Sequence, residues 1–175
     1  MRLRIGVDAA LITALNQKAA DFNQLESHIE VNPVSEVMNP KFYLWCEQRV
    51  ILAVVNGSWD RRTAEEYSAA FKQLATPLAG ADWAHIVYLD QWELGVPAIE
   101  PVIQELVQWC IQHKLRCAAQ IYCPHMVKKY QLERMIVDHT GAFEKRVYPT
   151  QHEAFQWLAA EGFDMETQDF RQKAS

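Results

Sequence analysis

The sequence lacks the short motifs that mark most cofactor sites. Its six glycines are scattered over 175 residues, and none of them forms the G-x-G-x-x-G or G-x-x-x-x-G-K-[ST] loop that cradles a phosphate. The G-x-S-x-G turn of serine hydrolases is absent, and so is the H-x-x-x-H or H-E-x-x-H spacing of zinc sites. We therefore expect no cofactor, no metal ion, no catalytic residues and no enzymatic activity.

An excess of positive charge and a long apolar run are also missing. The formal net charge is -5 and the sequence pI is about 5.7, whereas surfaces that bind nucleic acid are basic. No apolar run approaches the ~20 residues of a membrane helix. The first residues contain Asp8 and no small-residue cleavage site of a secretory signal. We expect a cytoplasmic protein that does not bind nucleic acid or insert into a membrane.

Cysteines and lysines lie in contexts that predict their exposure. The cysteines at positions 46, 110, 117 and 123 form no C-x-x-C pair, and three of them lie within apolar patterns. Free cysteines in such patterns behave as small hydrophobic residues, so reduced, buried thiols are expected. Basic pairs at 61–62, 128–129 and 145–146 lie beside acidic or polar residues. This context predicts solvated ends of helices or strands.

The pattern of apolar residues predicts an α/β domain behind an N-terminal amphipathic helix. That helix spans residues 8–26, and residues 28–40, with two prolines, are predicted to be a connection. Strands are predicted at 41–46, 50–55, 84–89, 115–122 and 142–148. Helices are predicted to begin at a capping box at Thr63, at Pro97, at Val127 and at a second capping box at Thr150.

The element order is ββαβαβαβα. Strands that alternate with single helices pair in parallel through right-handed crossovers, so we expect a mixed, mostly parallel sheet of about five strands with helical cover. The predicted organisation is an N-terminal helical extension at 1–27, one domain at 28–163 and a polar tail at 164–175.

Three motifs follow one another at characteristic spacing. They are the strand and turn at 54–60 before residues 63–67, the strand that ends at Asp90, and residues 153–158 before Gly162 and Phe163. In this order they resemble the SpoIIAA-like, or STAS-like, domains of bacterial anti-sigma-factor antagonists, and in particular an uncharacterised branch of that family. The resemblance covers roughly residues 28–163. It implies the SpoIIAA-like fold and action through a protein partner.

One departure from the antagonists concerns their regulation. In those proteins a partner kinase phosphorylates a serine or threonine near the start of the helix after the third strand. This chain has neither residue from Pro77 through His139, which argues against a kinase-regulated switch. Asp90 and Glu93 lie in the corresponding loop. They are predicted either to mimic a phosphorylated loop by their charge or simply to cap and solvate it.

Loops at the carboxyl ends of parallel strands meet at one edge of a sheet, where ligands bind in open α/β folds. We expect the loops at 57–60, 90–95 and 123–125 to meet there. Their predicted binding residues are Trp59, Asp60, Asp90, Trp92, Glu93 and His125. Exposed indoles would bind an apolar side chain or a small ligand, and buried ones would plug the end of the core.

The main hypothesis is a non-enzymatic STAS-like interaction or regulatory module whose partner is unknown. Homodimer formation or docking through the N-terminal helix stays open, as does a small-molecule ligand. A second hypothesis is a small-molecule or lipid carrier, which requires a cavity of roughly 300 Å³ or more. A third is an enzyme that uses Cys123 as nucleophile and His125 as base.

Overall fold

The computed structural model describes residues 35–123 and 127–167. The predicted N-terminal helix, most of the polar tail and His125 lie outside them. The strands are β1 (Glu36–Asn39), β2 (Phe42–Glu47), β3 (Val50–Val55), β4 (Trp83–Tyr88), β5 (Leu115–Ile121), β6 (His139–Thr140) and β7 (Phe143–Tyr148). The α-helices are α2 (Arg61–Ala75), α3 (Glu100–Gln112), α4 (Lys128–Met135) and α5 (Gln151–Ala160), and short 3₁₀ turns occupy Thr76–Leu78 and Pro97–Ile99.

The strands form one mixed sheet in the order β1-β2-β3-β4-β5-β7-β6. The central strands β3, β4, β5 and β7 run parallel, as predicted, and β1, β2 and β6 are joined antiparallel at the two sides. The prediction of about five strands is wrong, because the sheet has seven. β1 lies in the segment predicted as a connection, and β6 has only two residues, so neither edge strand offers the long apolar run by which the other strands were predicted.

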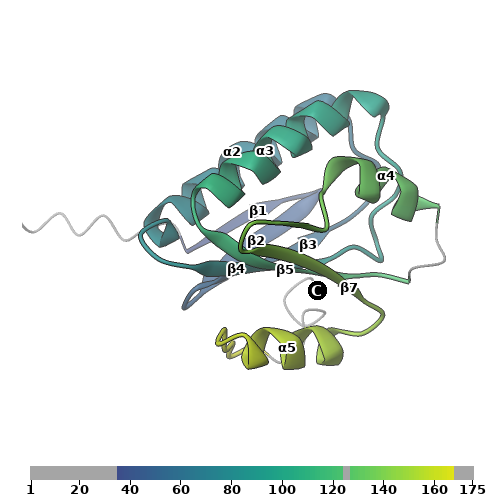
Figure 1. Cartoon of the computed structure of the whole chain (residues 1–175). Coiled ribbons are helices and arrows are strands. Elements are labelled where there is room, and N and C mark those ends of the chain that lie inside the picture. Colours follow the sequence, from purple (N-terminus) through teal and green to yellow (C-terminus); the bar gives the residue numbers. More distant parts are fainter. Residues whose placement is uncertain (1–34, 124–126, 168–175) are drawn as a thin grey trace, which may run out of the picture. The chain divides into compact units, whose positions relative to one another are not determined.

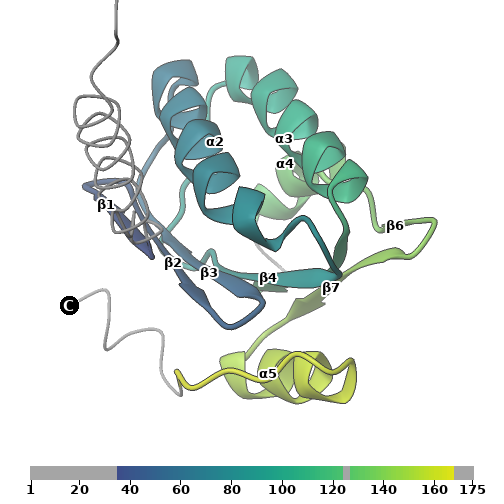
Figure 2. The same cartoon turned by 90° about the vertical axis from the view of Figure 1, so that its left-hand side faces the viewer.

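Helices cover both faces of this sheet. Figures 1 and 2 show α2, α3 and α4 on one face and α5 on the other. All six residues of β3 are buried, so this strand needs helices on both faces of the sheet. Ile51, Ala53 and Val55 join the core under α2 to α4, and Val50, Leu52 and Val54 join the core under α5. No helix of the described ranges is long and apolar enough to cross a membrane.

Helix starts follow the capping residues. The predicted cap at Thr150 is confirmed, because its hydroxyl oxygen accepts a hydrogen bond from the Glu153 amide. The predicted capping box at Thr63 is wrong by almost one turn. Asp60 is the N-cap of α2 instead, and its Oδ1 accepts hydrogen bonds of 2.8 Å from both the amide and the hydroxyl of Thr63. Aspartate caps a helix as well as threonine does.

Two predictions about exposure are wrong. Cys123 is exposed, although the four cysteines are all free as expected. Lys128 and Lys145 are buried rather than solvated. Each amine reaches backbone oxygens, and that of Lys145 lies 3.1 Å from the Ile136 carbonyl and 2.9 Å from the Asp138 carboxylate. The long apolar stem of lysine allows this burial when the charged end finds acceptors.

Candidate functional site

The loops after β3 and β4 meet at the carboxyl edge of the sheet, as predicted. Gly57 and Trp92 form a parallel bridge, in which the Gly57 amide donates to Gln91 O at 2.9 Å and the Glu93 amide donates to Gly57 O at 3.0 Å. Gly57 has a φ of +63°, a conformation that favours glycine. Farther along, the Val96 amide donates to Trp59 O. The two loops therefore extend the sheet beyond its strands.

The loop after β5 is tied to the same edge. The backbone amide of Cys123 donates to Asp90 Oδ1 at 3.2 Å. His125 lies outside the described residues, so the pairing of Cys123 with His125 stays a prediction. Within 35–123 and 127–167, no group of three or more His, Cys, Asp or Glu side chains is placed to hold a metal ion.

Trp59 and Trp92 are both buried, each with 4% of its surface exposed. Trp59 donates from Nε1 to Asn56 O at 3.1 Å, and its ring lies 5.0 Å from the ring of Tyr67. Of the two alternatives left open by the sequence, burial is the one observed: the two bonded loops turn both rings inward, where they close the end of the core. Neither indole is exposed for binding.

The three predicted carboxylates have different roles. Asp60 caps α2, and the hydrogen bonds from Thr63 lower the pKa of its carboxyl group. Asp90 anchors the loop after β5 through Cys123. Glu93 is exposed, and its backbone amide donates to Gly57 O. Two of the three are therefore positioned by local backbone contacts.

Lys128 holds the loop after β4, and the sequence analysis missed it. Its ammonium donates to three carbonyl oxygens, those of Leu89 at 2.6 Å, Asp90 at 3.0 Å and Trp92 at 2.7 Å. Burial lowers the pKa of Lys128, and the nearby charge of Asp90 opposes that shift. No feature of the sequence distinguishes it from Lys129, because the three acceptors lie some forty residues earlier in the chain.

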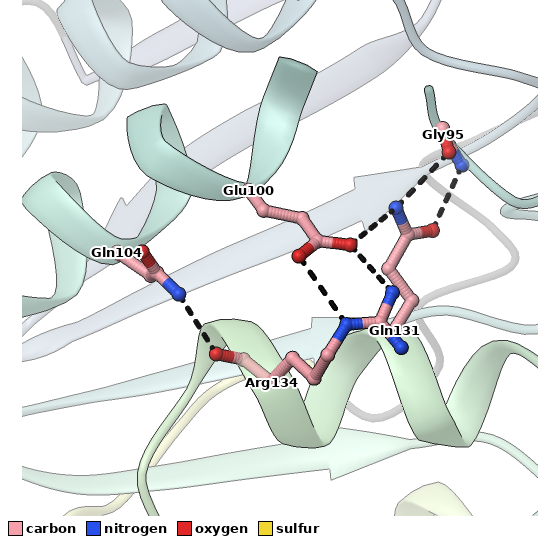
Figure 3. Close-up of polar contacts among 5 residues, drawn as sticks. All are labelled: Gly95, Glu100, Gln104, Gln131 and Arg134. Carbon is pink, nitrogen blue, oxygen red and sulfur yellow. Dashed lines mark hydrogen bonds and ion pairs between the residues drawn. The ribbon is translucent and has the colours of Figure 1, made fainter. Parts of the chain in front are cut away.

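Gln131 ties the same loop to α4 one turn further on (Figure 3). Its amide oxygen accepts from Gly95 N and its amide nitrogen donates to Gly95 O, both at 3.0 Å. A side-chain amide carries the same donor and acceptor as a peptide group, so it satisfies both backbone groups of Gly95.

Arg134 joins α4 to the start of α3. It bonds the Glu100 carboxylate with two nitrogens, at 2.6 and 3.3 Å, and this lowers the pKa of Glu100. Gln104 donates to Arg134 O at 2.9 Å.

Four exposed apolar side chains flank these anchors. Leu94 and Val96 lie on either side of Gly95, Val127 precedes Lys128 and Tyr130 precedes Gln131. Their exposed fractions are 48%, 47%, 66% and 67%. We call Leu94, Val96, Val127 and Tyr130 the carboxyl-end surface. Sequence reasoning missed it, because apolar residues beside strand ends are ordinarily assigned to the core.

A cavity of about 100 Å³ lies between the sheet and helices α2, α3 and α4. Its lining is almost entirely apolar and includes the rings of Trp59 and Trp92. The volume is well below the roughly 300 Å³ at which drug-sized ligands are bound. A lipid chain does not fit this cavity, so the lipid-carrier hypothesis is not supported.

Comparison with known proteins shows similarity in structure alone. No protein-family model matches the chain, and no curated protein matches it. An uncharacterised protein from Shewanella loihica, of the DUF3478 family and with a SpoIIAA-like fold, superposes with a TM-score of 0.51 at 11% identity, over 70% of this chain and 98% of that one. An anti-sigma factor antagonist from Mycobacterium paratuberculosis gives 0.45 at 14% identity, over 70% and 99%. The superposition on the Shewanella protein shows that this chain has the SpoIIAA-like fold.

Proposed function

We propose that this chain is a non-enzymatic regulatory module that binds a partner protein through the carboxyl-end surface. The observation that carries the proposal is the exposure of Leu94, Val96, Val127 and Tyr130 around the residues that fix this part of the backbone. Apolar side chains grouped in this way characterise surfaces that another molecule covers.

The anchoring of the loop favours binding. Lys128 and Gln131 together make five hydrogen bonds to the backbone of residues 89–95, three from the amine and two from the amide. A loop that is already ordered loses little conformational entropy when a partner covers it. Tyr130, a residue type enriched at binding hot spots, stands on the helix that supplies both anchors.

The chemistry of the loop favours constitutive binding. No serine or threonine lies between Pro77 and His139, so a hydroxyl there is not the switch. Asp90 and Glu93 carry permanent negative charge beside the apolar side chains. We infer a partner surface that is apolar at its centre and basic at its margin, because opposite charges at the rim of an interface steer association.

The test is site-specific photo-crosslinking in the source organism. A benzophenone side chain is placed at Tyr130 in one variant and at Ala159, an exposed residue of α5, in a control. The expected result is one protein adduct from position 130 that is absent from position 159. Adding Leu94→Glu to the Tyr130 variant should abolish the adduct, since a charge at the centre of an apolar contact is desolvated without a partner.

The proposal is wrong if positions 130 and 159 give the same adducts, or if Leu94→Glu leaves the adduct unchanged. An adduct with a second copy of the chain would instead assign the carboxyl-end surface to homodimer formation. Folding of each variant is checked by its circular dichroism spectrum.

A further inference from the structure

The cavity under α2, α3 and α4 contains two polar side chains whose roles the fold leaves unexplained. They are His85 of β4 and Gln120 of β5. In the parallel register, His85 pairs with Ala118 and Val87 pairs with Gln120. Because side chains alternate across a strand, His85 and Gln120 lie on the same face, on neighbouring strands and two positions apart.

Gln120 is buried with 2% of its surface exposed. Its Oε1 has no hydrogen-bond partner in the described part of the chain, and Gln120 is one of the residues that line the cavity. Buried polar atoms are almost always hydrogen-bonded, and one without a partner is costly. An apolar residue would fill this position of the core at lower cost, so Gln120 brings an acceptor without a donor to the wall of the cavity.

His85 supplies a second acceptor. Its Nδ1 lies 2.9 Å from Ile51 O, and since a carbonyl only accepts, Nδ1 carries the proton. The neutral ring then has an unprotonated Nε2. Burial lowers the pKa of His85 to about 4, so the ring is neutral near neutral pH. The remaining lining is apolar and aromatic apart from the phenol hydroxyl of Tyr67, and it includes the rings of Trp59 and Trp92.

We propose that the cavity is a binding site for a small neutral alcohol, whose hydroxyl group donates a hydrogen bond to Gln120 Oε1 or His85 Nε2 and whose hydrocarbon part contacts the apolar walls. The two acceptors favour a ligand that donates a hydrogen bond, and they would repel an anion. An ammonium group would lose its hydration in the cavity without gaining a countercharge. An apolar cavity of about 150 Å³ accommodates benzene. A cavity of about 100 Å³ therefore limits the ligand to roughly four heavy atoms.

The site is independent of the proposed partner surface, because its lining includes none of Leu94, Val96, Val127 and Tyr130. It also differs from the lipid carrier considered above in the size of its ligand. The hydroxyl requirement makes it testable with two probes of four heavy atoms and similar shape, 2-propanol, which donates a hydrogen bond, and acetone, which does not.

The experiment is a titration of the full ¹⁵N-labelled chain with each probe, followed by two-dimensional NMR. We expect 2-propanol to shift the side-chain amide signals of Gln120 and the indole signals of Trp59 and Trp92, with an affinity at least tenfold higher than that of acetone. In Gln120→Met, 2-propanol should bind at least tenfold more weakly and acetone should bind unchanged. Gln73→Met, at an exposed glutamine of α2, should alter neither.

A second variant tests the cavity independently, in case Gln120→Met does not fold. Ala118→Val adds two methyl groups to the cavity wall and should weaken both probes while the backbone spectrum is kept. The proposal is overturned if 2-propanol shifts none of these signals, or if it binds Gln120→Met as tightly as the native chain. A cavity that holds only water would give the first of these results.

Discussion

The ammonium nitrogen of Lys128 lies 2.6 Å from the carbonyl oxygen of Leu89, the residue that precedes the loop after β4. The same amine reaches Asp90 O and Trp92 O. A helix that begins after β5 thus fixes the turn after β4 through one buried charge. The shape of the carboxyl edge depends on this contact between two segments far apart in the sequence.

Lys128→Met should destabilise the fold, because three carbonyl oxygens, two of them in buried contacts, lose a charged donor while the shape of the side chain is nearly kept. Hydrogen bonds to charged groups are worth about 1.5 to 3 kcal/mol each. Methionine also removes the cost of burying the lysine charge, which offsets part of that sum, so we expect a net loss of about 3 kcal/mol in the free energy of unfolding. Urea denaturation measures it. The matched control is Lys129→Met, whose amine is paired with Glu133 at the surface and which should cost less than about 0.5 kcal/mol.

Gly95→Ala should also be destabilising, for a steric reason. A Cβ at Gly95 would overlap Cδ1 of the buried Ile99 and lie 3.3 Å from Trp59 O. Overpacking of this kind costs about 2 kcal/mol. Gly80→Ala is the control, since a Cβ there meets nothing within 4 Å. Equal denaturation midpoints for the two variants would contradict the packing described around Gly95.

Stability should fall with acidification through the titration of His85. Burial lowers its pKa in the folded state to about 4, against about 6.5 in the unfolded chain. Between these values the unfolded state binds the proton and the folded state does not, so the free energy of unfolding decreases as pH falls from about 6.5 to about 4. The upper limit of this loss is about 3 kcal/mol, from the difference between the two pKa values.

The measurement is urea denaturation at several pH values, with His85→Asn as the control. Asparagine keeps a donor near the position of Nδ1 and does not titrate. Carboxylates such as Glu100 and Asp138 have lowered pKa values, so their protonation also destabilises the fold in acid. They are present in both proteins, so the difference between the two slopes of unfolding free energy against pH gives the contribution of His85 alone. Parallel pH profiles would show that His85 is not buried as a neutral ring.

Asp60 offers a test of a structural against a binding role. Asp60→Ala removes the N-cap of α2 and should lower the denaturation midpoint, whereas Asp60→Asn keeps an oxygen acceptor and should leave the midpoint close to that of the native chain. If both variants instead retain native stability but lose the partner adduct, Asp60 is a binding residue, as the sequence analysis predicted, and its capping contact is dispensable.

The sequence alone determined the elements whose signal is local. The boundaries of β3 are those predicted, and those of the other predicted strands differ by at most about one residue. For β3 the reason is its continuous apolar run, which marks a strand covered on both faces. Thr150 was identified as a helix cap from a spacing of three residues. The meeting of the loops at 57–60 and 90–96 followed from the parallel topology alone.

Only the tertiary structure decided which side chains are exposed at that edge and which are buried. Trp59 and Trp92 were expected as candidates for the surface and lie inside, while Lys128 was expected in solvent and lies under the loop. Gln120 and His85 face one cavity because of the register between β4 and β5. In each case the partners are thirty or more residues apart or on separate elements, and a local pattern carries no information about contacts formed by the packing of the whole sheet.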